Sequence, residues 1–241
     1  MSEVIEPHVH SSEFEEHLQF RNYMRDVILG ANDGLVSVFA LVLGVAAAGF
    51  GPTEVMLTGV SAMVAGAISM GIGEYISTKS QEEVYDAEKA LEVDHIENHL
   101  DHEISELREF YGDKGFEGEL LEQIVQKIAS DPEVLLKEMM MAEFGVLEEE
   151  RRSPITATII VSIAFFFGAI IAVFPFFFVN STTTGIIIAS IFSLIGLFAI
   201  GGGKAWAISG NINKSGLENL SLGAAGAIIT YIVGYIIGAN V

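Results

Sequence analysis

The chain has 241 residues, of which 51% are hydrophobic, and its mean hydropathy is +0.48. It carries 32 acidic and 12 basic side chains, a formal net charge of −20, and no cysteine. This balance excludes a nucleic-acid-binding protein, because neutralising phosphates requires clustered Lys and Arg. The lack of cysteine excludes disulfides, thiolate zinc sites and a cysteine nucleophile. The acidic surface instead favours cations as partners.

Long apolar segments dominate most of the chain. An acidic, histidine-containing N-terminal segment, residues 1–26, lacks the apolar core of a signal peptide. Each apolar segment has 23–25 residues, and a helix of that length is about 35 Å long, enough to cross a hydrocarbon core of about 30 Å. We therefore predict five transmembrane helices, at residues 27–50, 54–78, 155–179, 185–208 and 217–239.

The positions of the basic residues predict the orientation of these helices. All twelve Lys and Arg residues lie in three segments on one side of the membrane, residues 1–26, 79–153 and 204–216. The positive-inside rule assigns that side to the cytoplasm. The N-terminus and the segment between the second and third spans are therefore expected in the cytoplasm, and the C-terminus outside.

The segment between the second and third spans, residues 80–152, is an acidic insert with 22 acids against 7 bases, so it holds −15 of the net charge. The lack of Gly and Pro from Lys79 to Tyr111 predicts one long helix that continues from the second span. A second helix is expected at residues 117–129. Asp131 and Pro132 have the order typical of a helix start and predict a third helix, to about Glu150.

The predicted fold is therefore an all-α membrane protein with five transmembrane helices and a three-helix cytoplasmic insert between helices 2 and 3. The sequence divides into a cytoplasmic tail, two spans, a metal-binding insert and three further spans. Their boundaries are 1–26, 27–79, 80–152 and 153–241.

Potential metal ligands recur at steps of three and four along the first insert helix, which places them on one helical face. They are Glu92, His95, His99, His102, Glu103 and Glu106. Imidazoles and carboxylates suit Mn, Fe, Co and Zn ions. A stripe of this length would extend about 21 Å, so several ions or a second helix would be needed. A solvated acidic face is the alternative interpretation.

The spans contain fewer polar groups. Asp33 lies about two turns inside the first span, and an acidic residue inside a membrane is by default an ion ligand or a proton carrier. Met70 and Glu74 are one turn apart in the second span and combine a thioether with a carboxylate, which favours a transition metal. Met139 and Met140 precede Glu143 at helical spacing, although methionine on a helix is usually part of a core.

Four stretches of this sequence resemble the vacuolar iron transporter family, and the resemblance covers about residues 20–240. The stretches are Asp26 to Leu35, with Asn-Asp-Gly-Leu at its end; Ala65 to Ser77, with Ser80-Gln81; Met139-Met140-x-x-Glu143; and Ser215 to Leu220. The resemblance implies a homodimer of five-span subunits. It also implies a cytoplasmic domain that collects Fe²⁺ and passes it to a pore at the dimer interface, in exchange for protons and out of the cytoplasm. Mn²⁺ and related ions can often be carried in this family.

The resemblance also implies roles for individual residues. Asp33 and Met70 are expected as pore ligands, and the insert ligands are expected to be Glu103, Glu106, Met139, Met140 and Glu143. An earlier Glu-x-x-Glu pair of the family is best matched by Glu92-x-x-His95, which is a departure. An imidazole there would make metal loading more sensitive to pH near neutrality and favour Zn²⁺ or Co²⁺.

Two other functions compete with transport. The Glu92-x-x-His95 element also occurs in di-iron carboxylate bundles, so a membrane-anchored ferroxidase is one alternative. A metal buffer or sensor that uses the insert is the other. We expect a transporter rather than an enzyme, without a tightly bound cofactor and with Fe²⁺ as the transported or regulatory ion. The expected location is a prokaryotic plasma membrane, with a vacuolar membrane as the alternative.

Overall fold

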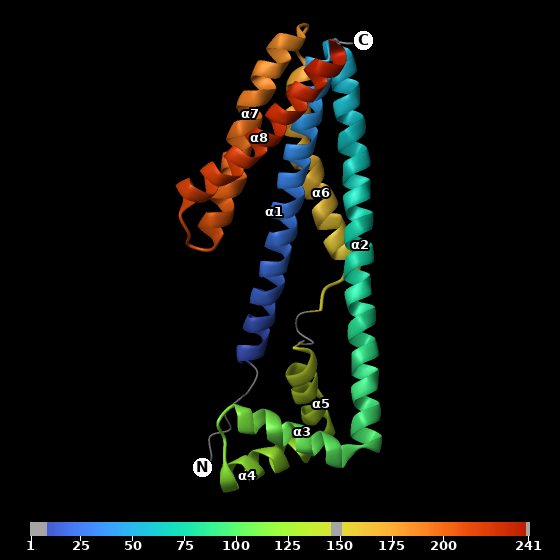
Figure 1. Cartoon of the computed structure of the whole chain (residues 1–241), viewed down its shortest axis with the longest axis vertical. Coiled ribbons are helices and arrows are strands. Elements are labelled where there is room, and N and C mark those ends of the chain that lie inside the picture. Colours follow the sequence, from blue (N-terminus) through green and yellow to red (C-terminus); the bar gives the residue numbers. More distant parts are fainter. Residues whose placement is uncertain (1–8, 146–150, 240–241) are drawn as a thin grey trace. The chain divides into compact units, whose positions relative to one another are not determined.

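The computed structural model describes residues 9–145 and 151–239, and it describes side chains at Arg21 and from Tyr23 onward within those ranges. The described residues form helices joined by short connections (Figure 1). The chain divides into two compact units. One contains residues 20–76 and 154–241, here called the membrane unit; the other contains the segment up to Gln19 and residues 77–153, here called the insert unit.

The membrane unit contains the five helices that are long and apolar enough to cross a membrane, as predicted. They are α1 (Val9–Ala47) from Phe20 onward, the first part of α2 (Pro52–Asn98), α6 (Pro154–Val173) with the 3₁₀ turn η3 (Phe174–Phe177), α7 (Thr182–Ala207) and α8 (Ile212–Gly238). Helix α1 begins well before the predicted first span, so part of the predicted tail is helical. The α-helical form of the predicted third span ends at Val173, two residues before Pro175, whose ring disfavours continuation of the helix.

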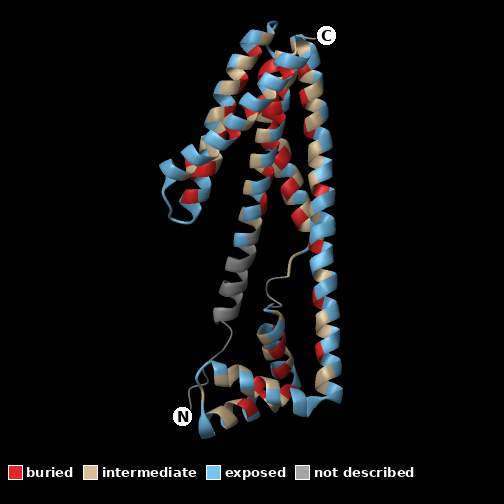
Figure 2. Cartoon of the chain, viewed as in Figure 1, coloured by how far each residue is buried: buried red, intermediate tan, exposed pale blue. Residues whose placement is uncertain are grey.

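Helix α1 supplies much of the core of the membrane unit. Leu35, Val38 and Val42 are buried among residues of α6 and α7 such as Phe165 and Leu197. Many residues on the outer faces of these helices are exposed (Figure 2), and many of those exposed side chains are large and apolar. Residues that are more than half exposed include Ile159, Phe167, Ile187, Ile191, Ile195 and Ile229. An apolar exterior over an apolar core is expected of a protein that lies in lipid.

Small residues let α1 approach its neighbours closely. A Cβ built on Gly34 would overlap the carbonyl oxygen of Phe165 in α6, and one built on Gly234 of α8 would overlap the carbonyl oxygen of Gly44 in α1. Close backbone approach at small residues is the usual way in which transmembrane helices pack. Gly34, the residue after Asp33, therefore allows α1 to lie directly against α6.

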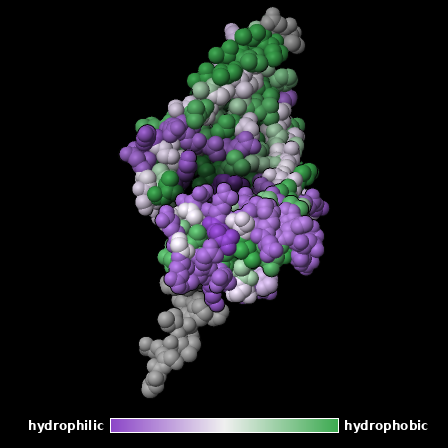
Figure 3. Space-filling view, turned by 60° about the horizontal axis from the view of Figure 1, so that its bottom comes forward, coloured by the Kyte–Doolittle hydropathy of each residue, from purple (hydrophilic) through white to green (hydrophobic). Residues whose placement is uncertain are grey.

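The insert unit contains the rest of α2, then α3 (Leu100–Asp113), α4 (Gly118–Ala129), α5 (Pro132–Met139) and the π-helical turn η1 (Met140–Phe144). Its core is formed by Leu107, Val125, Ile128, Leu135 and Met139. Arg108 donates from Nε to Glu122 Oε1 at 2.7 Å and from Nη2 to Oε2 at 3.1 Å, which joins α3 to α4. Figure 3 shows hydrophilic residues gathered over this unit.

The helices of the insert agree with the sequence prediction in part. The predicted single helix from Lys79 to Tyr111 is wrong, because α2 ends at Asn98 and a new helix starts at Leu100. The start of α5 is confirmed: the Asp131 side chain accepts a hydrogen bond from the Glu133 N–H at 3.0 Å. The predicted third helix reaches Phe144 only through a π-helical turn, and its predicted end at about Glu150 lies outside the described residues.

Candidate metal centre

The break between α2 and α3 arranges the candidate ligands. His99 leaves the helical conformation, with φ −136° and ψ 33°, while its N–H still donates to the His95 carbonyl at 2.7 Å. Glu92 and His95 therefore lie on α2, and Glu103 lies on a separate helix, α3. The expectation of one straight stripe about 21 Å long is wrong, because residues from the two halves of that stripe face each other across the break.

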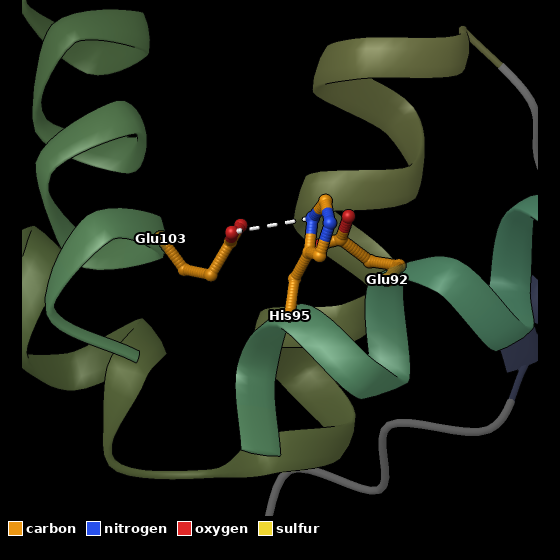
Figure 4. Close-up of side chains that lie close together, drawn as sticks. All are labelled: Glu92, His95 and Glu103. Carbon is orange, nitrogen blue, oxygen red and sulfur yellow. Dashed lines mark ion pairs between the residues drawn. The ribbon is translucent and has the colours of Figure 1, made fainter. Parts of the chain in front are cut away.

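Glu92, His95 and Glu103 form the first cluster. One potential ligand atom from each of them lies within 4.8 Å of the others. The His95 Nδ1 atom is 3.6 Å from Glu103 Oε1, and Figure 4 shows the Glu103 side chain pointing from α3 toward the imidazole. Two carboxylates and an imidazole are a ligand set suited to a first-row transition metal.

Both glutamates of this cluster are completely buried. None of their four carboxylate oxygens has a hydrogen-bond partner among the residues that the structure describes. Buried polar groups in folded proteins are nearly always paired, and an unpaired buried carboxylate is costly. The cluster therefore needs a positive partner, which a proton or a metal ion could supply.

The raised pKa of Glu92 also indicates that the cluster binds a proton or a cation. Glu92 lies in the polar part of α2, within the insert unit. Burial, followed by the charge of the neighbouring Glu103, raises its pKa to about 8. Two neighbouring carboxylates cannot both ionise easily in a site with little solvent. Near neutral pH the pair consequently keeps a proton unless a cation replaces it.

A second cluster contains Glu103, Glu106 and Glu143, again with ligand atoms within 4.8 Å of one another. Glu143 comes from the turn η1, where a π-helical geometry, common at functional sites, replaces the regular helix. Desolvation, followed by the charges of Glu106 and Glu103, raises the pKa of Glu143. Because Glu103 belongs to both clusters, the five side chains form one continuous group.

The other predicted ligands of the insert are placed less directly. Met139 and Met140 are both buried, and Met139 belongs to the core of the insert unit. Met139 also lines a 320 Å³ pocket together with Glu106 and Glu143. The structure thus places one thioether beside the second cluster, while it gives Met139 a packing role as well.

The predicted ligands of the spans belong to the membrane unit and to neither cluster. Asp33 is exposed on α1 and makes no hydrogen bond or ion pair with any residue that the structure describes. Met70 is half-buried and packs against the core of the membrane unit, and Glu74 is half-buried. Within the described chain, neither Asp33 nor Glu74 joins a cluster of three or more carboxylate or imidazole groups.

One polar contact beside Asp33 has no counterpart in the sequence prediction. Asn219 of α8 donates from Nδ2 to Asn32 Oδ1 and to the Leu197 carbonyl oxygen, both at 2.8 Å. Asn219 lies in the stretch Ser215 to Leu220, which the sequence resemblance had already singled out. These hydrogen bonds join α1 to α7 and α8 one residue away from the carboxylate.

Comparison with models of protein families matches residues 24–235 to the VIT family. The match includes part or all of each of the five spanning helices, and every residue of the two clusters. The chain belongs to the VIT family. The family resemblance predicted from the sequence motifs is thereby confirmed.

Individual VIT family relatives match almost the whole chain. It is 29% identical to "Vacuolar iron transporter 1" of Tulipa gesneriana, over 90% of this chain and 88% of that protein. It is 28% identical to the Arabidopsis thaliana protein of the same name, over 87% and 84%. It is also 28% identical to "Vacuolar iron transporter" of Plasmodium falciparum, over 94% and 86%. These names describe transporters, which agrees with the expectation that the chain is not an enzyme.

Proposed function

We propose that this protein transports divalent transition metals across a membrane, with Fe²⁺ as its main substrate. The observation that carries the proposal is the pair of completely buried glutamates, Glu92 and Glu103, beside His95. Their four carboxylate oxygens accept no hydrogen bond from any residue that the structure describes. This pair occurs in a chain with five candidate spans, in a family whose matched relatives are named iron transporters. An ion entering the clusters would replace the proton of Glu92.

The insert is proposed to load the ion. Its acidic residues attract cations and raise their local concentration. Glu103, shared by the two clusters, would bridge two ions held by Glu92 and His95 on one side and by Glu106 and Glu143 on the other. Met139 fits a softer ligand at the second position, since it lines the same pocket as Glu106 and Glu143. Met140 stays a predicted ligand from the family resemblance alone.

Asp33 is proposed as the ligand within the membrane, together with Met70 and, for proton transfer, Glu74. An unpaired carboxylate facing lipid is costly, so its exposed position on a single chain supports a water-filled passage formed with a second copy. Asp33 would bind the metal ion or a proton in turn, which keeps the charge within the membrane small in both states. This alternation would couple metal export to proton entry.

The orientation and location follow from the positive-inside rule and are proposals as well. With all twelve basic residues on one side, the N-terminus and the insert would lie in the cytoplasm and the C-terminus outside. Transport would then carry Fe²⁺, and also Mn²⁺, Co²⁺ or Zn²⁺, out of the cytoplasm. A prokaryotic plasma membrane is the proposed location.

The transport proposal is tested with the full-length protein in liposomes. Metal flux is measured for Fe²⁺, Mn²⁺, Co²⁺ and Zn²⁺, with and without an imposed pH gradient. We expect flux of Fe²⁺ that increases when protons can move in the opposite direction. Flux no faster than in protein-free liposomes for all four ions would overturn the proposal.

The shared carboxylate gives one specific reason to test a ferroxidase as well, because carboxylate-bridged pairs of iron ions occur in di-iron bundles. The same purified protein is mixed with Fe²⁺ in aerated buffer, and dissolved oxygen is followed. Oxygen consumption in proportion to the added iron would favour the ferroxidase. Transport without such consumption favours the transporter.

A further inference from the structure

A pocket of 630 Å³ lies in the membrane unit, between α1, α7 and α8. Figure 1 shows why it forms: the ends of α7 and α8 that meet near residue 210 diverge from α1. Helix α8 follows α1 closely higher up, where Gly234 lies against Gly44. The hydrogen bond between Asn219 and Asn32 marks the inner end of the divergence, since both residues line the pocket.

One end of this pocket is basic. Arg21, Arg25 and Lys204 line it, against a single acidic residue, Glu218. This reverses the balance of the whole chain, in which acids outnumber bases 32 to 12. Lys204 makes no hydrogen bond or ion pair with any described residue, and the Arg25 side chain is 62% exposed although its Nε lies 3.6 Å from Asp26 Oδ1. A basic mouth repels metal cations and attracts an anion.

The rest of the pocket is apolar. Ile28 and Leu29 of α1 and Leu222 of α8 line it beyond the basic end. Leu29 and Leu222 are 48% and 67% exposed, so the pocket opens toward the region where lipid would lie. Along α1, the distance from Arg21 to Asn32 is about 16 Å at 1.5 Å per residue, enough for a headgroup and the first part of an acyl chain.

We propose that this pocket binds an anionic glycerophospholipid. Arg21, Arg25 and Lys204 hold the phosphate, and the upper part of an acyl chain lies against Ile28, Leu29 and Leu222. Basic pockets between membrane helices are suited to lipid headgroups. A free phosphate would leave the apolar part of the pocket unused, and a neutral lipid would bring no net negative charge to the basic end, where Lys204 makes no hydrogen bond or ion pair with a described residue. The site is separate from the acidic clusters of the insert.

The first test uses the full-length wild-type protein. A phosphatidylglycerol with a photoactivatable diazirine on one acyl chain is incorporated into liposomes with the protein, and labelled peptides are mapped after irradiation. We expect labelling of the α1 segment around Ile28 and of α8 around Leu222, reduced by excess phosphatidylglycerol but little by phosphatidylcholine. Labelling spread evenly over all five spans would overturn the proposal.

The second test measures selectivity. Native mass spectrometry of the detergent-solubilised protein compares the binding of phosphatidylglycerol with that of phosphatidylcholine. Lys204→Gln should reduce the preference for phosphatidylglycerol about fivefold, and adding Arg25→Gln should reduce it about fivefold again. The matched control is Lys214→Gln, which removes a base that does not line the pocket and should leave the preference unchanged.

The two tests together leave each outcome interpretable. Equal binding of both lipids to the wild type would contradict the proposal. An equal loss of preference in Lys204→Gln and Lys214→Gln would contradict it too, because it would show that the lipid is attracted by the net charge of the protein only. Failure of a variant to fold is detected by circular dichroism, and the labelling of the wild type then decides alone. Competition by glycerol phosphate as strong as that by the intact lipid would likewise contradict a lipid site.

Discussion

The Nδ1 atom of His95 and the Oε1 atom of Glu103 lie 3.6 Å apart, although they belong to different helices on the two sides of the break at His99. This contact brings together the two halves of a ligand series that would be far apart on one straight helix. It also places Glu103 between Glu92 on one side and Glu106 with Glu143 on the other. The predictions about metal binding follow from the shared position of Glu103.

Glu103→Gln should weaken both metal positions at once. We expect the number of Mn²⁺ ions bound per chain, measured by calorimetry on the full-length protein, to fall toward zero over the range that saturates the wild type. Glu106→Gln should remove only one position, because Glu106 belongs to one cluster. Glu97→Gln, an exposed glutamate of the same region, is the matched control. Unchanged stoichiometry in Glu103→Gln would contradict the shared role.

The same variant should not destabilise the metal-free protein. In this buried site the charge of Glu103 disfavours ionisation of Glu92, and an amide at position 103 removes that charge. We therefore expect an equal or higher melting temperature for Glu103→Gln in the presence of a chelator. A large fall in melting temperature would mean that Glu103 acts mainly in folding and that its effect on metal binding is indirect.

Metal affinity should increase with pH until about pH 8. The pKa of Glu92 is raised to about 8 by burial and by Glu103, so below that pH an incoming ion must displace a proton. One displaced proton changes the apparent affinity by up to about tenfold per pH unit. Calorimetric titrations with Mn²⁺ between about pH 6 and 9 would show this slope and its end. An affinity independent of pH over that range would contradict the account.

The stability of the metal-free protein should change in the opposite direction. Between about pH 4.3, where an unperturbed glutamate ionises, and about pH 8, the folded Glu92 retains a proton that the unfolded chain has lost. The stabilisation from this group is therefore complete below about pH 4.3 and is lost as pH rises to about 8. Glu92→Gln should flatten that part of the pH profile of the melting temperature. An identical profile in the variant would refute the assignment.

Gly34→Ala should destabilise the membrane unit. The added Cβ would overlap the Phe165 carbonyl oxygen, which belongs to the backbone and cannot move aside cheaply. We expect a loss of about 1–3 kcal/mol, typical of overpacking, measured as a lower melting temperature in detergent. Gly226→Ala is the control, since nothing lies within 4 Å of its Cβ position and alanine favours a helix. Equal effects of both substitutions would show that α1 and α6 do not pack as described.

The five spans could be predicted from the sequence because their signal is local: each apolar segment is long enough by itself to cross a membrane. The break in the helix at His99 could not be predicted from the sequence. Asn98 and His99 are only mildly unfavourable in a helix, and a helix that turns here lets Leu107 enter the core with Val125 and Leu135. Asp101 and Glu103 in the first turn of α3 were the available local signal, since acidic residues favour helix starts.

The candidate site, too, could be predicted from the sequence only in part. The residue types and the family motifs identified Glu92, His95, Glu103, Glu106 and Glu143 as potential ligands. The sequence could not show that Glu103 lies between two clusters, because that depends on the turn between α2 and α3. The roles of Asp33 and Met70 stay predictions, since the proposed passage would involve residues of two copies of the chain.

The central claim is that Asp33 binds the transported ion within the membrane, and metal flux into liposomes tests it most directly. Asp33→Asn keeps the size of the side chain and removes its charge, while Glu54→Gln removes another carboxylate from the start of a spanning helix and is the control. The account predicts that Asp33→Asn abolishes Fe²⁺ flux and its dependence on the pH gradient, and that Glu54→Gln retains both. Wild-type flux with an unchanged pH dependence in Asp33→Asn would contradict the account.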